Sequence, residues 1–181
     1  MSGSIVNIAG YRFVDIPDRD ELRQPFRDVC QKLNIKGTIL IAKEGINFFL
    51  SGTQESIDEY LAFIEEDTRF HNIPLKISYS DYQPFRRMNV RLKNEIISIG
   101  LDHIKPADKT GEEITPTDFK KLLDDGEDIL VLDTRNDYEI RIGTFQMATE
   151  LNIKTFRDFP RAVDEMSDDL KDKPVVMFCT G

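Results

Sequence analysis

The chain has 181 residues, of which 40% are hydrophobic and 31% are charged, and its formal net charge is −9 at pH 7. This length allows one large domain or two small ones with a substantial core. No apolar run approaches the roughly 20 residues of a membrane-spanning helix, and the first residues lack the basic and apolar stretches of a secretory signal. We therefore expect a cytoplasmic globular protein that has no membrane partner.

Cysteine and histidine are too few and too scattered to predict a metal site. The chain has two cysteines, Cys30 and Cys179, and two histidines, His71 and His103. Two cysteines in separate segments do not make a disulfide framework, and these four residues show none of the spacings of metal ligands. Flavin and haem motifs are not visible either. The sequence therefore predicts no bound metal, and no cofactor is evident.

The first half of the chain has an alternating order of strands and helices. The predicted elements are a strand over residues 4–15, a helix that begins after Asp18 or Asp20, strands over 38–42 and 46–50, a helix that begins after Ser51 or Thr53, and a strand over 75–79. Residues 43–45 join the two middle strands as a hairpin. This order is that of the ferredoxin-like, or acylphosphatase-like, βαββαβ fold. We expect such a domain over residues 1–95, with Cys30 as core filler on the apolar face of the first helix.

A basic stretch near the end of this domain is the candidate nucleic-acid contact. Residues 1–100 hold 13 basic and 14 acidic side chains, so nearly all of the net negative charge lies in the second half. Basic residues alternate with Met88, Val90 and Leu92, which is typical of a half-buried strand with one basic face. A plain solvated strand would have the same pattern. If RNA is the partner, the candidate contacts are Arg86, Arg87, Arg91, Lys93 and, in the hairpin, Lys43.

The second half has the pattern of a parallel α/β domain. Residues 96–112 are rich in turn-forming residues and are expected to be a linker. Thr115 and Pro116 are typical of a helix start, and residues 124–126 end that helix. An apolar strand then runs to Asp133, a short helix is expected over 155–166, and a last buried strand is expected over 175–178. Because strands that alternate with helices pair in parallel, we expect a parallel α/β domain over residues 113–181.

Cys179 stands where the last strand gives way to a turn of small residues. A thiol there is placed for chemistry, because a following helix would direct its amide groups and positive dipole end at the sulfur and favour the thiolate. The alternative is a buried strand-end cysteine that acts as a small hydrophobic residue. Position alone does not decide between the two.

Several segments of the second half resemble a rhodanese domain. They are the strand that ends in Asp133 and Arg135, Glu139 a few residues later, the Gly143–Ala148 segment, and the strand-end Cys179. The resemblance implies that Cys179 is the catalytic cysteine and carries a persulfide. Asp133, Arg135 and Glu139 are then expected to support the active site structurally, without taking part in the chemistry.

The whole chain is similar to one subgroup, the rhodanese-domain tRNA uridine hydroxylases. The segments that carry this similarity are Lys36–Asn47, Pro84–Lys93, Asp133–Phe145 and Phe178–Gly181. Members of the subgroup hydroxylate the wobble uridine (uridine 34) of tRNA to 5-hydroxyuridine, using molecular oxygen. The similarity implies molecular oxygen as co-substrate and tRNA as partner, with the N-terminal domain holding the anticodon arm. No DNA partner is expected.

One part of a rhodanese domain that the resemblance implies is not contained in residues 1–181. A rhodanese domain has further helices and a strand after its catalytic loop, and the sequence ends two residues after Cys179. We therefore expect the second domain to be truncated after the catalytic cysteine, with one side of its sheet uncovered.

Two other functions fit the same residues. A sulfurtransferase would move sulfane sulfur through a Cys179 persulfide and would need no RNA. A non-enzymatic binding module would merely bury Cys179. Thiol reactivity separates the binding module from both enzymes, and RNA binding by residues 1–95 separates the hydroxylase from the sulfurtransferase. Within the hydroxylase, thiolate attack on the uracil ring and chemistry through an oxidised sulfur, a persulfide or a sulfenate, both remain open.

Overall fold

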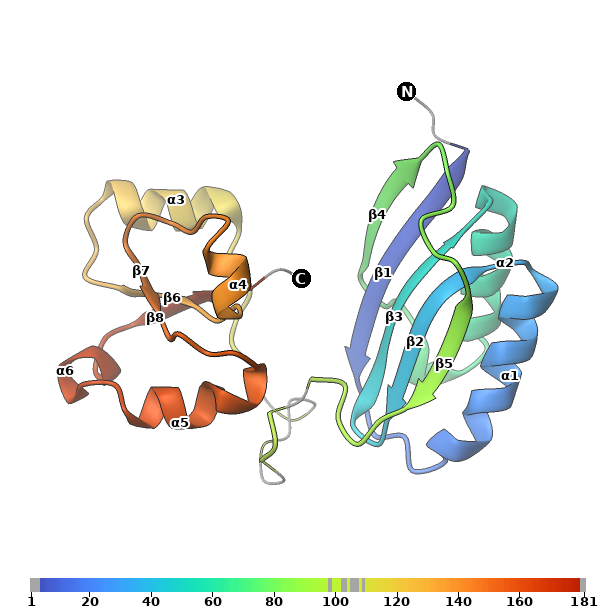
Figure 1. The fold of residues 1–181 in the computed structure, drawn as a ribbon, viewed down its shortest axis with the longest axis horizontal. Helices are drawn as coiled ribbons and strands as arrows, with labels where there is room; N and C mark the ends of the chain where they lie inside the picture. The colour runs from blue at the N-terminus through green and yellow to red at the C-terminus, as the bar shows by residue number, and fades with distance from the viewer. Residues whose placement is uncertain (1–3, 98, 102–103, 105–107, 109, 180–181) are drawn as a thin grey trace. The chain divides into compact units, whose positions relative to one another are not determined.

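A computed structural model describes residues 4–97, 99–101, 104, 108 and 110–179. They form two compact units (Figure 1), which we call the N-terminal unit, up to Ile96, and the C-terminal unit, from Thr110. No helix in the described part of the chain is long and apolar enough to cross a membrane.

The N-terminal unit is a five-stranded sheet with two α-helices. Its elements are β1 (Ile5–Phe13), α1 (Arg19–Lys32), β2 (Lys36–Ala42), β3 (Gly45–Gly52), α2 (Gln54–Ile64), a short 3-10 helix (Thr68–Phe70), β4 (Leu75–Ser80) and β5 (Met88–Leu92). The strand order is β4-β1-β3-β2-β5, and all pairs are antiparallel except β2 with β5. The first four strands and two helices have the predicted βαββαβ order, which confirms the ferredoxin-like fold, and β5 adds a parallel edge strand.

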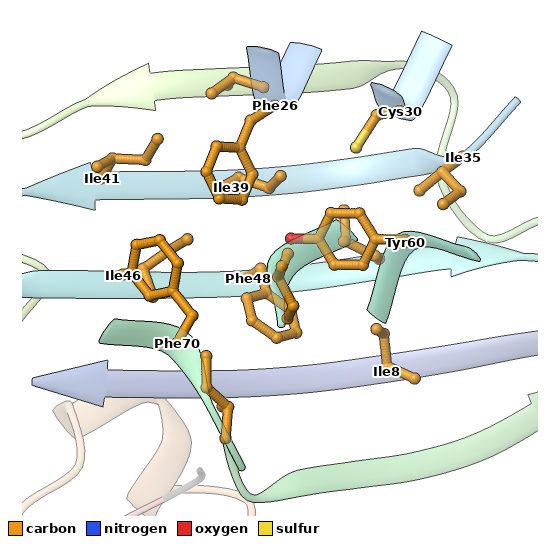
Figure 2. Packing of buried hydrophobic residues seen from close by; sticks show 14 of the residues in the cluster. Ile8, Phe26, Cys30, Ile35, Ile39, Ile41, Ile46, Phe48, Tyr60 and Phe70 are labelled. Carbon is orange, nitrogen blue, oxygen red and sulfur yellow. The ribbon is translucent and has the colours of Figure 1, made fainter. Parts of the chain in front are cut away.

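The core of this unit lies between the sheet and the two helices, α1 and α2 (Figure 1), and Figure 2 shows its packing. Phe26 of α1 meets Tyr60 of α2 and Phe70 edge to face, with ring centroids 6.4 and 6.0 Å apart. Cys30 is fully buried in the same cluster, as its place on the apolar helix face predicted. Burial raises the pKa of the Cys30 thiol to about 12, so this thiol stays protonated at neutral pH.

Tyr60 provides a test of this packing. Its side chain is fully buried, and its hydroxyl has no hydrogen-bond partner among the described residues. Burial raises the pKa of Tyr60 well above its ordinary value, and the charge that Cys30 acquires only at high pH adds to this. Because a buried hydroxyl without a partner costs free energy, Tyr60→Phe should raise the free energy of unfolding by about 1 kcal/mol in urea titrations. A less stable variant would mean that the hydroxyl has a hydrogen bond after all.

The C-terminal unit has a three-stranded parallel sheet with short helices around it. Its elements are α3 (Pro116–Asp124), β6 (Leu130–Asp133), α4 (Asp137–Ile140), β7 (Ala148–Glu150), a 3-10 helix (Phe156–Asp158), α5 (Phe159–Asp164), α6 (Asp168–Lys171) and β8 (Val175–Phe178). The strand order is β7-β6-β8, and both pairs are parallel, as predicted. Thr115 caps α3 by accepting a hydrogen bond from the backbone N–H of Asp118 (3.1 Å), and Pro116 is the first helical residue.

Three short elements of this unit were not predicted from the sequence, and the burial of a fourth was predicted wrongly. Sequence reasoning found no sign of β7, α4 or α6, because three or four residues are too few to show a period. It also predicted that β8 is buried, and this is wrong: Val175 and Met177 are 46% and 56% exposed. β8 is an edge strand that pairs only with β6 among the described strands, whereas all four residues of β6 are buried. The exposed side of β8 agrees with the expectation that one side of this sheet lacks cover.

Candidate functional site

Cys179 follows β8 directly and is exposed. The end of β8 is held to the residue after β6, because the backbone N–H and the hydroxyl of Thr134 both donate to the carbonyl of Phe178, at 3.1 and 3.0 Å. Cys179 lines a hollow of about 420 Å³ together with Arg135, Gly143, Thr144, Phe145 and Phe178. The fold thus brings Arg135 and the Gly143 segment to Cys179, although they lie more than thirty residues away in the sequence.

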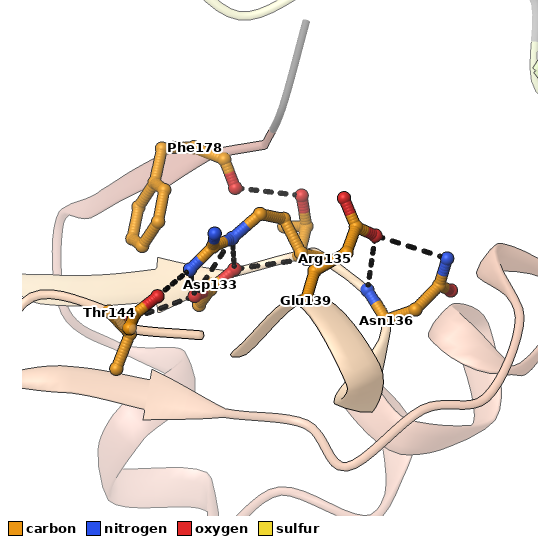
Figure 3. Close-up of polar contacts among 8 residues, drawn as sticks. Asp133, Arg135, Asn136, Glu139, Thr144 and Phe178 are labelled. Carbon is orange, nitrogen blue, oxygen red and sulfur yellow. Dashed lines mark hydrogen bonds and ion pairs between the residues drawn. The ribbon is translucent and has the colours of Figure 1, made fainter. Parts of the chain in front are cut away.

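Asp133 and Arg135 form a closed polar network on one side of this hollow (Figure 3). Asp133 Oδ1 accepts hydrogen bonds from the backbone N–H and Nε of Arg135, both at 3.0 Å, and Asp133 Oδ2 accepts one from Arg135 Nη2 at 2.7 Å. The Thr144 hydroxyl donates to Asp133 Oδ2 at 2.7 Å, and Arg135 Nη2 also donates to the carbonyl of Gly143 at 2.7 Å. The network therefore fixes the guanidinium group and ties the Gly143 segment to β6.

Both charges of this pair are stabilised. Burial alone would raise the pKa of Asp133, but hydrogen bonds from the Arg135 side chain, from Thr144 and from the Arg135 backbone outweigh burial and lower the pKa. The pKa of Arg135 is raised, first by its hydrogen bonds to Asp133 and then by the charges of Asp133, Glu139 and Cys179. Arg135 is thus a permanent cation that lines the same hollow as Cys179.

The lowered pKa of Asp133 predicts an acid-sensitive C-terminal unit. A carboxyl group whose pKa is lower in the folded state stabilises the fold above its unfolded pKa of about 3.9, and this contribution disappears as the pH falls through the folded pKa. Urea titrations between pH 7 and about pH 2 should therefore show a decline in unfolding free energy below about pH 4. In Asp133→Asn this part of the decline should be absent, and an unchanged decline would contradict the assignment.

Aromatic rings form the other wall of the hollow. The ring of Phe178 packs edge to face on Phe145, with centroids 4.9 Å apart, and Phe145 packs on Phe119 in the same way at 5.4 Å. The guanidinium of Arg135 lies over the Phe178 ring, 5.5 Å from its centroid. The site therefore combines an exposed sulfur, one fixed cation and an apolar wall. Among the described residues, no group of three or more His, Cys, Asp or Glu side chains is arranged to hold a metal ion.

Glu139 lies in α4, close to Arg135 in sequence, and has a structural contact of its own. Its Oε2 accepts hydrogen bonds from the backbone N–H of Asn136 and from the Asn136 side-chain amide, both at 3.2 Å. The backbone bond is the Glu139 half of a capping box at the start of α4. This arrangement positions the turn that follows Arg135. Sequence reasoning did not find Thr144 or the aromatic wall, because Gly143-Thr144-Phe145 has no polar pattern that points at Asp133.

The five candidate RNA contacts all lie in the N-terminal unit and are exposed. Arg91 belongs to β5, Arg87 and Lys93 flank that strand, Arg86 lies in the segment before it, and Lys43 lies in the turn between β2 and β3. In the part of the chain that the structure describes, none of these side chains is in an ion pair. The turn that contains Lys43 also has a structural role, because the backbone carbonyl of Lys43 accepts a hydrogen bond from the backbone N–H of Ile16 at 2.8 Å.

Comparisons with known proteins agree with this architecture. The model of the UPF0176 acylphosphatase like domain matches residues 5–96. The tRNA uridine(34) hydroxylases of Cupriavidus pinatubonensis and Ralstonia nicotianae are 45% and 44% identical to this chain over 98% of its length. The chain spans 64% of the length of each of these relatives.

Among solved structures, the dark state of BlrB, a BLUF protein, is matched over 55% of this chain and 81% of that chain, with 18% identity and a TM-score of 0.45. This likeness has no bearing on the function of the chain. The family match and the two relatives, in contrast, identify the family of the chain, because together they cover nearly all of the 181 residues. The chain belongs to the family that carries the UPF0176 acylphosphatase like domain and is a homologue of the tRNA uridine(34) hydroxylases.

Proposed function

We propose that the protein hydroxylates uridine 34 of tRNA to 5-hydroxyuridine, with molecular oxygen as co-substrate and Cys179 as the catalytic residue. The observation that carries the proposal is the identity of 45% to a tRNA uridine(34) hydroxylase over 98% of the chain. The exposed thiol of Cys179, which lines the hollow, is a suitable catalytic group for this reaction.

The residues of the hollow suit a uracil ring. Phe178 and Phe145 offer apolar surface to a flat base, and Arg135 supplies a fixed cation in the same hollow as the Cys179 sulfur. A thiolate there is a nucleophile that attacks the uracil ring or carries an oxidised sulfur. Asp133 and Glu139 act only by holding Arg135 and the following turn in place.

The first test of this function is nucleoside analysis of bulk tRNA from cells with and without the gene. We expect 5-hydroxyuridine and nucleosides derived from it to disappear when the gene is removed. Unchanged 5-hydroxyuridine in the deletion strain would contradict the proposed function. Restoring the gene on a plasmid is the control, and the nucleoside should return.

The basic residues of the N-terminal unit are expected to hold the tRNA. Replacing Arg86, Arg87 and Arg91 with glutamine should weaken tRNA binding, because a phosphate that is no longer neutralised keeps its counterions. The slope of log affinity against log salt should become shallower by up to about 0.9 for each such phosphate. Filter binding or fluorescence anisotropy at several salt concentrations measures both effects.

A matched set of changes in the other unit controls for net charge. It replaces three basic residues of the C-terminal unit with glutamine: Lys120, Lys121 and Lys154. This variant has the same net charge as the arginine variant, and it should bind tRNA nearly as well as the wild type. Equal weakening by the two sets would contradict the assignment of tRNA binding to the N-terminal unit.

A sulfurtransferase is the second candidate, because an exposed cysteine beside a fixed cation also suits a persulfide. This activity would transfer sulfane sulfur from thiosulfate to an acceptor thiol without RNA. Mass spectrometry of Cys179 after incubation with thiosulfate detects the persulfide. Persulfide turnover together with unchanged tRNA in the deletion strain would favour the sulfurtransferase.

A further inference from the structure

One face of the N-terminal sheet lies opposite the core cluster: its end positions Ala42 and Ser51 are buried, whereas Tyr11 and Phe49 between them are exposed. Along each strand, alternate residues point toward α1 and α2, and the residues between them point to the opposite side. We call this opposite side the open face. It consists of the odd-numbered residues of β1, β3 and β5 and the even-numbered residues of β2 and β4. The register places all of these positions on one side, because each pairs across the strands with others of the set.

Two largely exposed aromatic side chains of the open face stand on β1 and β3, two of the three inner strands of the sheet. Phe49 of β3 is 50% exposed, and Tyr11 of β1 is 48% exposed. The direct cross-strand partners of Phe49 are Ala9 and Thr38, and that of Tyr11 on β3 is Asn47. These cross-strand neighbours are small or polar. Phe13, on the same face, meets Tyr11 edge to face with ring centroids 5.9 Å apart, and about half of each of the Tyr11 and Phe49 side chains stays exposed.

The two rings are near enough to act together. Tyr11 lies opposite Asn47, two residues from Phe49 on the same strand, so the rings are diagonal neighbours. Diagonal positions on one face of an antiparallel pair are about 7–8 Å apart. Two neighbouring nucleotides of one unpaired strand could therefore each stack on one ring.

The charge of the open face is opposite to that of the whole chain. None of its positions in β1 to β5 is an aspartate or a glutamate, although the chain has a net charge of −9. Its charged residues are Lys36, Lys76 and Arg91. Lys76 pairs with Ala9 in the row that contains Phe49, and Arg91 pairs with Leu40 in the row that contains Tyr11. Each row thus combines one aromatic ring with one cation.

We propose that the open face binds an unpaired RNA segment, with bases stacked on Tyr11 and Phe49 and with phosphates contacted by Lys76 and Arg91. Aromatic rings on a sheet surface bind unpaired bases in this way, because every base has a flat face, and nearby cations neutralise the phosphates. The choice of RNA rests on the proposed function, whereas the aromatic and charge pattern is independent of it. Arg91, already a candidate RNA contact from the sequence, belongs to β5 and lies on this face.

The test compares two RNAs on the 181-residue chain. The probes are an RNA hairpin with an unpaired loop and a fully paired RNA duplex of equal length, both measured by fluorescence anisotropy. The hairpin should bind more tightly, and Tyr11→Ala and Phe49→Ala should each weaken its binding by roughly 5- to 100-fold. Phe49→Tyr should retain the affinity and Phe49→Leu should not, because only tyrosine preserves the stacking surface. Arg91→Gln should make the salt slope shallower by about 0.7.

The control residue lies in the same sheet. Tyr79 of β4 is 61% exposed, but it pairs with the core residue Val6 and so belongs to the side of the sheet that faces the helices. Tyr79→Ala should leave hairpin affinity unchanged. The proposal is overturned if the hairpin does not bind, if hairpin and duplex bind equally, if Tyr79→Ala weakens binding as much as Phe49→Ala, or if Phe49→Leu, folded by circular dichroism, binds like the wild type.

This experiment and the nucleoside analysis can fail separately. RNA binding is measured without turnover, so a hairpin-binding open face in a protein whose deletion leaves tRNA unchanged would remove only the proposed hydroxylase function. Loss of 5-hydroxyuridine in the deletion strain, with hairpin affinity insensitive to Tyr11 and Phe49, would remove only the RNA-binding role of the open face.

Discussion

A Cys179→Ser protein is expected to keep its fold and to lose tRNA hydroxylation by on the order of 10³-fold or more. Cys179 is exposed at the end of β8, outside the buried core, and serine is close to cysteine in size, so the substitution should leave the fold intact. A serine hydroxyl is a far weaker nucleophile than a thiolate and cannot carry a persulfide or sulfenate. Formation of 5-hydroxyuridine by purified protein measures the loss, and thermal melting confirms the fold.

The second cysteine is the matched control. Cys30 is buried, and its raised pKa keeps it protonated. Cys30→Ser should retain hydroxylation and lower the free energy of unfolding, because it puts a hydroxyl into an apolar core. In the folded wild type, iodoacetamide should alkylate Cys179 and spare Cys30 at neutral pH. Preferential modification of Cys30 would contradict the burial on which this comparison rests.

The second large effect is expected at Asp133. Its carboxylate is fully buried and is bonded to Arg135 and Thr144, so Asp133→Ala leaves the guanidinium of Arg135 without its partner. Removing one partner of such a pair leaves the other charge uncompensated. We expect this variant to lower the stability of the C-terminal unit and to lose activity with it, by clearly more than the exposed-pair control below. Amide hydrogen exchange in β6 measures the effect within this unit.

An exposed ion pair in the same unit is the control for Asp133. Lys120 and Asp124 of α3 form an i, i+4 pair in which both side chains are largely exposed. Asp124→Ala should change stability by less than about 1 kcal/mol, because water screens such pairs. If Asp133→Ala were as stable as the wild type yet inactive, the structural assignment would be wrong, and Arg135 would become a candidate substrate ligand.

The N-terminal fold was predictable because its elements are long. β1, α1, β2, β3 and α2 each contain seven residues or more, enough to show a clear period and a capping or turn signal. The open face was not predictable. Phe48 and Phe49 are adjacent in one apolar run, and only the register of the sheet shows that Phe48 enters the core while Phe49 is exposed on the other side.

The candidate site was predictable in its residues and only partly in its geometry. The strand ends at Asp133 and Phe178 follow from two apolar runs, and parallel pairing brings them to one edge of the sheet. The hydrogen bond from Thr144 to Asp133 depends on the path of the loop after α4, and a loop has no periodic sequence pattern from which its path could be predicted. The exposure of β8 depends on what lies beside an edge strand, which an apolar run cannot show.

The most direct test of the central claim is the amount of 5-hydroxyuridine at position 34 of tRNA from cells whose only copy of the gene carries Cys179→Ser. Cells that carry the wild type and Cys30→Ser are measured in parallel. We predict that the nucleoside is absent in the Cys179→Ser strain and present in the other two. Undiminished 5-hydroxyuridine in the Cys179→Ser strain would remove Cys179 from the mechanism and contradict the proposed chemistry.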